Sequence, residues 1–150
     1  MRPTDTLRQA LTAIVAELGF ALPEKTVIEP PRDPKHGDLS TNVAMLLAKE
    51  ARTNPRELAQ TIAAKLPQAC ADIAHAEAAG PGFCNVTFAP SFWQNLVTAI
   101  LEQKEHFGES TMGQKRKVLV EYVSANPTGP LHVGHGRGAA VGDSNTRLLR

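Results

Sequence analysis

The sequence predicts an α+β two-layer domain over about residues 1–108, a linker over 109–117, and the first strand, turn and helix of an α/β domain over 118–150. Three observations support this prediction. The first 108 residues give the order helix, strand, helices, two strands, helix, which is typical of an α+β domain. Residues 109–117 are polar. Residues 118–123 form a near-continuous apolar run, the pattern of a strand buried on both faces of a parallel sheet.

The N-terminal segment has apolar residues at helical spacing from Leu7 to Leu18, which predicts an amphipathic helix. Thr4 or Asp5 is the expected N-cap and Gly19 the expected stop. Residues 26–29 are β-prone and end at two prolines, which cannot donate to a strand ladder. We therefore expect a short strand there.

Two helices are expected next. A Pro-rich loop leads into apolar residues 43–47, a helix that Ser40 or Thr41 is placed to cap. Asn54-Pro55 has the composition of a helix start, and Pro67 is expected to close that helix.

The following segment predicts a hairpin and a helix. Residues 73–78 are alanine-rich and favour a helix by propensity, whereas residues 84–88 alternate as a strand does. Because Gly-Pro-Gly lies between them, we expect two strands joined by a tight turn. Cys84, Val86 and Phe88 would share one face of the second strand. A helix is then expected from Pro90 or Ser91 to near Gly108.

Composition indicates a folded cytoplasmic protein without a membrane partner, because no apolar run approaches the roughly 20 residues of a membrane span and no signal-peptide core is present. Cys70 and Cys84 lack metal-ligand spacing and are too few for a disulfide scaffold, so both are expected to be reduced packing residues and no protein-bound metal is expected. Residues 1–112 carry 10 basic and 13 acidic residues, a balance of −3, whereas residues 113–150 carry six and two, a balance of +4. Only the second segment has the sign expected for phosphate ligands.

The turn after the apolar run has the composition of a phosphate site. Prolines and glycines fix a turn over residues 127–130, and the next helix is expected to begin at Val133 or Gly134. The free N–H groups and positive dipole end of that helix attract phosphate. His132 and His135, three residues apart, are expected on the same side, where they can donate hydrogen bonds to a triphosphate attacked at its α-phosphorus.

Three other interpretations of this turn stay open. Gly134, Gly136 and Ala139 match the dinucleotide pattern G-x-G-x-x-A, although that pattern does not call for histidines. A second interpretation assigns the histidine pair to a zinc ion, which needs three or four ligands. A glycine-rich turn can also merely pack a helix against a sheet.

The segment Leu131-His132-Val133-Gly134-His135 resembles the His-x-Gly-His signature of class I aminoacyl-tRNA synthetases, and residues 120–143 resemble the form found in arginyl-tRNA synthetases. The stretches "HGDLSTNVAMLLAK" and "GPGFCNVTF" resemble that family's N-terminal additional domain. The resemblance implies that residues 1–108 are this additional domain, and that residues 118–150 open a truncated Rossmann-like catalytic domain.

The resemblance also implies a reaction. Arginine and ATP form arginyl-adenylate, and the arginyl group then passes to its tRNA. The expected partners are L-arginine, the tRNA for arginine, and ATP with Mg²⁺, in an enzyme expected to be a monomer. The motif would span Ala125 to His135, with His132 and His135 as catalytic residues that contact the ATP phosphates, and Gly134 making room for adenine.

The same resemblance assigns Glu121, Ser124 and Asn126 to the arginine pocket. The chemistry of arginine agrees independently, because a guanidinium has only donors and needs a carboxylate and neutral acceptors. A salt bridge at the end of a strand is the alternative role for Glu121.

The additional domain in this family is thought to touch the D-loop of tRNA. Phe83 would stack on a flipped-out base and Asn85 would hydrogen-bond its edge. Strand alternation places both on the face opposite Cys84, which favours their exposure. Arg32 and Lys35 add local positive charge, but the −3 balance of residues 1–112 predicts weak tRNA binding by this domain alone.

The family's Lys-Met-Ser-Lys-type loop, the rest of the arginine pocket and the anticodon-binding domain are not found in these 150 residues, so we do not expect the chain alone to catalyse. Residues 1–108 are expected to fold independently and 118–150 to be poorly ordered or to dock opportunistically. The alternatives are a stand-alone tRNA-binding module and a nucleotidyltransferase that shares the two-histidine phosphate site.

Overall fold

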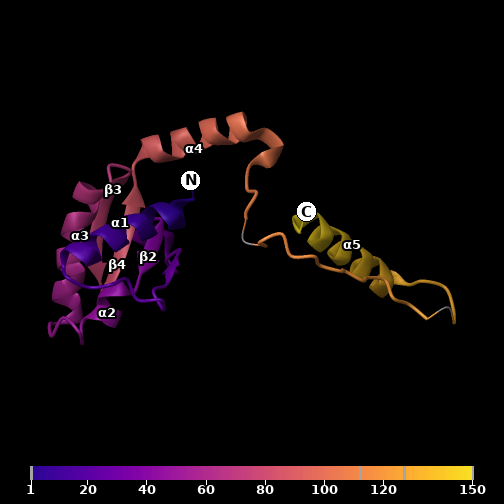
Figure 1. Cartoon of the computed structure of the whole chain (residues 1–150), viewed down its shortest axis with the longest axis horizontal. Coiled ribbons are helices and arrows are strands. Elements are labelled where there is room, and N and C mark those ends of the chain that lie inside the picture. The colour runs from indigo at the N-terminus through magenta and orange to yellow at the C-terminus, as the bar shows by residue number, and fades with distance from the viewer. Residues whose placement is uncertain (1, 112, 127, 150) are drawn as a thin grey trace. The chain divides into compact units, whose positions relative to one another are not determined.

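The computed structural model describes residues 2–111, 113–126 and 128–149. Their contacts divide the chain into two compact units, residues 1–105 and residues 106–150 (Figure 1). Pro127, which belongs to the predicted turn, lies outside the described residues. Each unit is described by itself below.

Among the described residues of the first unit, four strands form one antiparallel sheet with the order β1-β2-β4-β3. They are β1 (Ile28–Glu29), β2 (Leu39–Thr41), β3 (Ile73–Ala79) and β4 (Phe83–Phe88). The predicted hairpin of the last two strands is confirmed, with a register shift between Ile73 and His75. The Gly-Pro-Gly turn correctly indicated a strand over residues 73–78, where alanine propensity favoured a helix.

Helices pack against this sheet. They are α1 (Pro3–Glu17), α2 (Val43–Leu47), α3 (Pro55–Ala69) and α4 (Pro90–Gln103). Helix α3 contacts β3 and β4 as well as α1 and α2, so it joins the helical layer to the sheet. The largest fully buried side chains come from both layers: Leu7, Leu11, Ile14, Leu47, Ile62, Leu66 and Val86 among them. Helices packed on an antiparallel sheet agree with the predicted α+β architecture.

Strand β2 corrects the prediction of a continuous loop before α2. Leu39–Thr41 pair with both β1 and β4, so Ser40 and Thr41 do not cap α2, and Asn42 occupies the N-cap position. Asp38 extends the ladder, because its N–H donates to the Val86 carbonyl (2.8 Å) and its carboxylate accepts from the Phe88 N–H (2.7 Å). The residues before α2 have turn-forming composition, but pairing with the distant strand β4 makes them a strand.

Two helix ends also differ from prediction. Helix α1 begins at Pro3 with Arg2 at the N-cap, two residues before Thr4 and three before Asp5, because proline is favoured at the first helical position. Its predicted stop is confirmed, since Gly19 follows with a φ of +87°. Helix α3 continues past Pro67 to Ala69. Pro67 lacks an N–H donor, but the helical hydrogen bonds continue beyond it, since the Cys70 N–H donates to the Leu66 carbonyl (3.1 Å).

Helix α4 begins at Pro90 as predicted and is followed by a 3₁₀ turn, Lys104–His106, so the helical run ends near Gly108. In the second unit, α5 (Val133–Leu148) confirms the predicted helix start.

The strand predicted over residues 118–123 is absent from the structure. These residues have no strand assignment, and Val118 and Leu119 are 61% and 95% exposed. A strand of a parallel sheet needs neighbouring strands for its hydrogen bonds, and the described residues of this unit contain none. Tyr122 instead packs on α5 at Gly142, where an added Cβ would overlap the tyrosine ring.

Candidate functional site

The N-terminus of α5 is closed by the two histidines of the motif. His132 is the N-cap, and its Nδ1 accepts from the Gly134 N–H at 3.1 Å. In return, the His132 N–H donates to Nδ1 of His135 at 3.1 Å. The two rings lie with their centroids 4.0 Å apart. The structure thus brings the predicted pair together as a reciprocal cap in which imidazoles satisfy two free N–H groups of the helix start.

These hydrogen bonds assign the tautomers. Because each Nδ1 accepts from a backbone N–H, each ring carries its proton on Nε2 and is neutral in this arrangement. His132 is exposed and His135 is half-buried. Each ring therefore keeps one Nε2–H available as a donor. In the described part of the chain, no group of three or more His, Cys, Asp or Glu side chains lies where it could hold a metal ion.

Gly134 makes room for the ring of His132. A Cβ built on Gly134 would lie 2.9 Å from Cε1 and 3.1 Å from Nδ1 of that ring, closer than ordinary contact. In this structure the imidazole of His132 lies in the space that the missing Cβ of Gly134 leaves open. Its predicted role toward adenine stays a prediction.

Of the three residues assigned to the arginine pocket, two are in contact. The Ser124 hydroxyl donates to Oε1 of Glu121 at 2.5 Å, across Val123, whose φ of +60° turns the chain sharply. Asn126 is exposed, and its backbone carbonyl accepts from the Thr128 N–H at 2.8 Å. Among the described residues, no hydrogen bond or ion pair joins these groups to the histidine pair.

Phe83 borders a hollow on the first unit. The hollow has a volume of about 220 Å³ and is lined by residues in or next to β1, β2, α2 and β4: Val27, Glu29, Ser40, Thr41, Asn42, Met45 and Phe83. Phe83 is 39% exposed, as predicted. The Asn42 carbonyl oxygen Oδ1 accepts from the Val27 N–H at 2.9 Å. Sequence reasoning missed Ser40, Asn42 and Glu29, because their position depends on strand pairings that no local pattern reveals.

Asn85 corrects the prediction of exposure. It is only 6% exposed, although strand alternation puts it on the same face as Phe83. Asn85 lies in the middle of the central strand β4, directly between Ser40 on β2 and Glu77 on β3. A short side chain flanked on both sides is covered by its neighbours, whereas Phe83 lies at the end of the strand.

Arg32 and Lys35 are exposed in the loop before β2. The Lys35 N–H donates to Oδ1 of Asp33 at 3.0 Å, which holds a 3₁₀ turn, Pro34–His36. The loop meets β4 where Gly37 approaches Val86, three residues from Phe83 and about 10 Å along the strand. Neither Arg32 nor Lys35 is among the residues that line the hollow beside Phe83.

The two cysteines are free. Cys84 is fully buried on β4, and burial raises the pKa of its thiol to about 12. Its Sγ lies 3.4 Å from the Ala59 carbonyl oxygen. These contacts confirm the packing role predicted for Cys84.

In the described part of the chain, no helix has the length and apolar character needed to cross a bilayer.

Comparison with known proteins covers almost the whole chain. The family model described as the arginyl tRNA synthetase N terminal domain matches residues 4–88, and that of the class I (R) tRNA synthetase catalytic domain matches residues 96–150. Arginine–tRNA ligases of Desulfovibrio desulfuricans and Lawsonia intracellularis are 67% and 49% identical over all 150 residues, which span 27% of each relative's length. The solved structure of Thermus thermophilus arginyl-tRNA synthetase matches 97% of this chain and 23% of its own, with a TM-score of 0.58 and 30% identity. The chain belongs to the arginyl-tRNA synthetase family.

Proposed function

We propose that this chain is the N-terminal part of an arginine–tRNA ligase, a class I enzyme that activates arginine with ATP and transfers it to tRNA. One observation carries the proposal. The two family models cover successive stretches of the chain, and the His-x-Gly-His residues of the second stretch form the cap and first turn of α5. In this proposal residues 1–108 are the additional domain, 109–117 the linker, and 118–150 the start of a Rossmann-like catalytic domain in a cytoplasmic monomer.

The ATP site is proposed at the start of α5. Two neutral imidazoles with Nε2–H donors suit the phosphate oxygens whose charge grows during attack at the α-phosphorus. In the present arrangement the imidazoles occupy the Gly134 and His132 N–H groups. Phosphate that binds directly to those N–H groups must displace the rings, so binding would exchange two internal hydrogen bonds for bonds to the nucleotide. Mg²⁺ would accompany the phosphates, and no residue of this chain is assigned to it.

The arginine site is proposed beside Glu121. The Ser124 hydroxyl holds Oε1 of this carboxylate, which orients the group for a bidentate partner such as a guanidinium. Asn126 is exposed and offers an amide oxygen as a neutral acceptor. The remaining acceptors would come from sequence outside these 150 residues.

The tRNA contact is proposed at the hollow beside Phe83. The half-exposed ring supplies a stacking surface, and Ser40 and Asn42 supply polar groups in the same hollow. Asn85 would reach a base edge only after its neighbours move, because it is buried. Arg32 and Lys35 would contribute to a separate phosphate contact. The hollow also favours the second candidate function, a tRNA-binding module, for the chain on its own.

A chimera tests the proposed activity. The 150 residues are joined to the remaining length of the Desulfovibrio desulfuricans relative, and charging of tRNA with labelled arginine is measured. We expect charging with arginine, and His132→Asn or His135→Asn to lower kcat/KM by about 10²–10³. His75→Asn, an exposed histidine of the first unit, is the matched control. A folded chimera that charges another amino acid, or none, contradicts the proposal.

A further inference from the structure

The closest packing of helix α4 on the first unit is in its first turn. Phe92 is the buried residue of this helix, and its ring stacks on Phe88 with centroids 4.4 Å apart. Trp93 lies edge-on to both rings, at 6.0 Å from Phe88 and 5.2 Å from Phe92. This aromatic cluster fixes the beginning of α4 against the end of β4.

The rest of α4 carries an exposed apolar stripe. Val97 is 56% exposed, Ile100 38% and Leu101 70%, and they continue the line of Trp93 at helical spacing. Glu102 is the only charged residue from Pro90 to Gln103. A helix with so little charge and apolar side chains around most of its surface is typical of a buried position.

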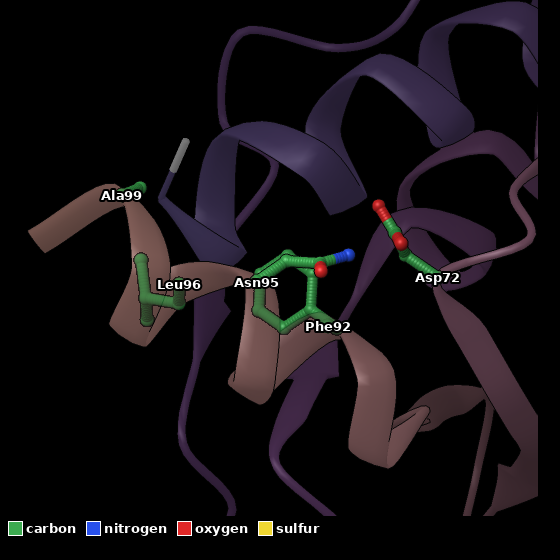
Figure 2. Close-up of a pocket in the computed structure, with 5 residues that line it drawn as sticks. All are labelled: Asp72, Phe92, Asn95, Leu96 and Ala99. Carbon is green, nitrogen blue, oxygen red and sulfur yellow. The ribbon is translucent and has the colours of Figure 1, made fainter. Parts of the chain in front are cut away.

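The side of α4 toward the domain is also incompletely filled. A hollow of about 240 Å³ lies there, lined by Asp72, Phe92, Asn95, Leu96 and Ala99. Figure 2 shows four of these side chains along α4 and Asp72 on the segment before β3. Beyond Phe92, the inner side of the helix thus borders an unfilled hollow, and its outer side is exposed.

We propose that the second half of α4, Leu96–Gln103, is a docking surface for catalytic-domain residues that lie outside these 150. The family model of the catalytic domain begins to match at residue 96, in the middle of this helix, whereas the match of the N-terminal domain's family model ends at residue 88. In this proposal the first turn of the helix packs on the sheet, and its exposed apolar stripe packs on the catalytic domain. The relatives carry a further 73% of their length to supply the covering residues. The inference rests on family membership and not on the proposed reaction.

Hydrogen exchange tests this inference. Backbone amide exchange in α4 is compared between the 150-residue chain and the chimera described above. The docking surface predicts that amides of residues 97–103 exchange about tenfold or more slowly in the chimera, while amides of α1 differ little. Val97→Ser with Leu101→Ser should remove most of this protection in the chimera and leave the melting temperature of the 150-residue chain nearly unchanged. The control is Gln94→Ser with Thr98→Ser, on the polar stripe of the same helix, which should retain the protection.

Two results would overturn the inference. One is equal exchange of residues 97–103 in both proteins. The other is self-association of the 150-residue chain in sedimentation that the Val97→Ser, Leu101→Ser pair abolishes, since a second copy would then be the occupant. If the chimera does not fold, the chain mixed with the separately produced remaining part gives the same comparison. The exchange measurement does not depend on catalysis, so the two proposals can fail separately. An inactive chimera whose α4 amides are protected contradicts only the proposed function. An active chimera whose α4 amides are not protected contradicts only the docking surface.

Discussion

Replacing Phe83 separates a base-stacking role from a packing role. The ring is 39% exposed at the edge of a hollow of about 220 Å³, so part of it is free to meet a ligand. Stacking of a base on an aromatic ring contributes about 1–3 kcal/mol, which corresponds to a roughly 5- to 150-fold change in affinity. Phe83→Leu removes the aromatic face and keeps apolar bulk, whereas Phe83→Tyr keeps the face.

The loss of folding stability on replacing Phe83 can be estimated from the same exposed fraction. Truncation of a fully buried Phe to Ala costs about 3–5 kcal/mol, so with two-fifths of the residue exposed Phe83→Ala should cost about 2 kcal/mol. That loss would blur a binding measurement. Phe83→Leu should cost less than about 1.5 kcal/mol and is the better probe.

The assay is equilibrium binding of the tRNA for arginine to the chimera, with urea denaturation of each variant in parallel. We expect Phe83→Leu to weaken binding at least about fivefold and Phe83→Tyr to bind as the parent does. The loss should persist when salt is raised, because stacking depends less on salt than phosphate contacts do. Unchanged binding by Phe83→Leu, or an equal loss in Phe83→Tyr, would refute the stacking role.

Four further predictions concern the first unit. Thr41→Val should raise the free energy of unfolding by about 1–2 kcal/mol in urea, because the Thr41 hydroxyl is buried without a hydrogen-bond partner among the described residues; a loss of stability would show that it has one. Gly37→Ala should lower the free energy of unfolding by at least about 2 kcal/mol, since Gly37 has a φ of +97° and its Cβ would lie 2.7 Å from the Val86 carbonyl oxygen; an unchanged urea midpoint would contradict this. Cys84 should resist thiol reagents at pH 8 in the folded chain while half-buried Cys70 reacts first, and equal reaction rates would count against its burial. Because the folded thiol keeps its proton to about pH 12 and the unfolded one loses it near 9.0, stability should fall above pH 9, by up to about 1.4 kcal/mol per pH unit, and Cys84→Ala should remove this fall.

Elements with local signals were predictable from the sequence. Prolines at the starts of α3 and α4, Gly19 after α1 and the Gly-Pro-Gly turn before β4 each fix a boundary through the chemistry of a few neighbouring residues. The start of α5 was predictable for the same reason.

Features set by distant partners were not predictable. Strand β2 exists because Leu39 pairs with Val86, 47 residues later, and turn formers around it indicated a loop. Asn85 is buried because β4 is central in the sheet, a fact that alternation within one strand does not contain. Residues 118–123 have strand composition but find no neighbouring strand among the described residues.

In the candidate sites too, features with a local sequence signal were predictable and those set by distant partners were not. The motif identified His132 and His135 as a pair, and the structure adds that their rings cap α5 through Nδ1. The structure also joins Ser124 to Glu121 by a hydrogen bond, and their assignment to the arginine pocket stays a prediction. The polar residues around Phe83 lie on or next to β1 and β2, whose pairing the sequence alone did not reveal, so Ser40 and Asn42 were missed.

We propose that residues 118–150 open the catalytic domain of an arginine–tRNA ligase. The most direct test of this proposal is amino-acid-dependent ATP–pyrophosphate exchange by the chimera, measured with each amino acid in turn, with and without the tRNA for arginine. We expect exchange with arginine alone among the amino acids, and we expect it to require the tRNA and to be lost in His132→Asn. Exchange stimulated by a different amino acid, or none in a folded chimera under either condition, would contradict it.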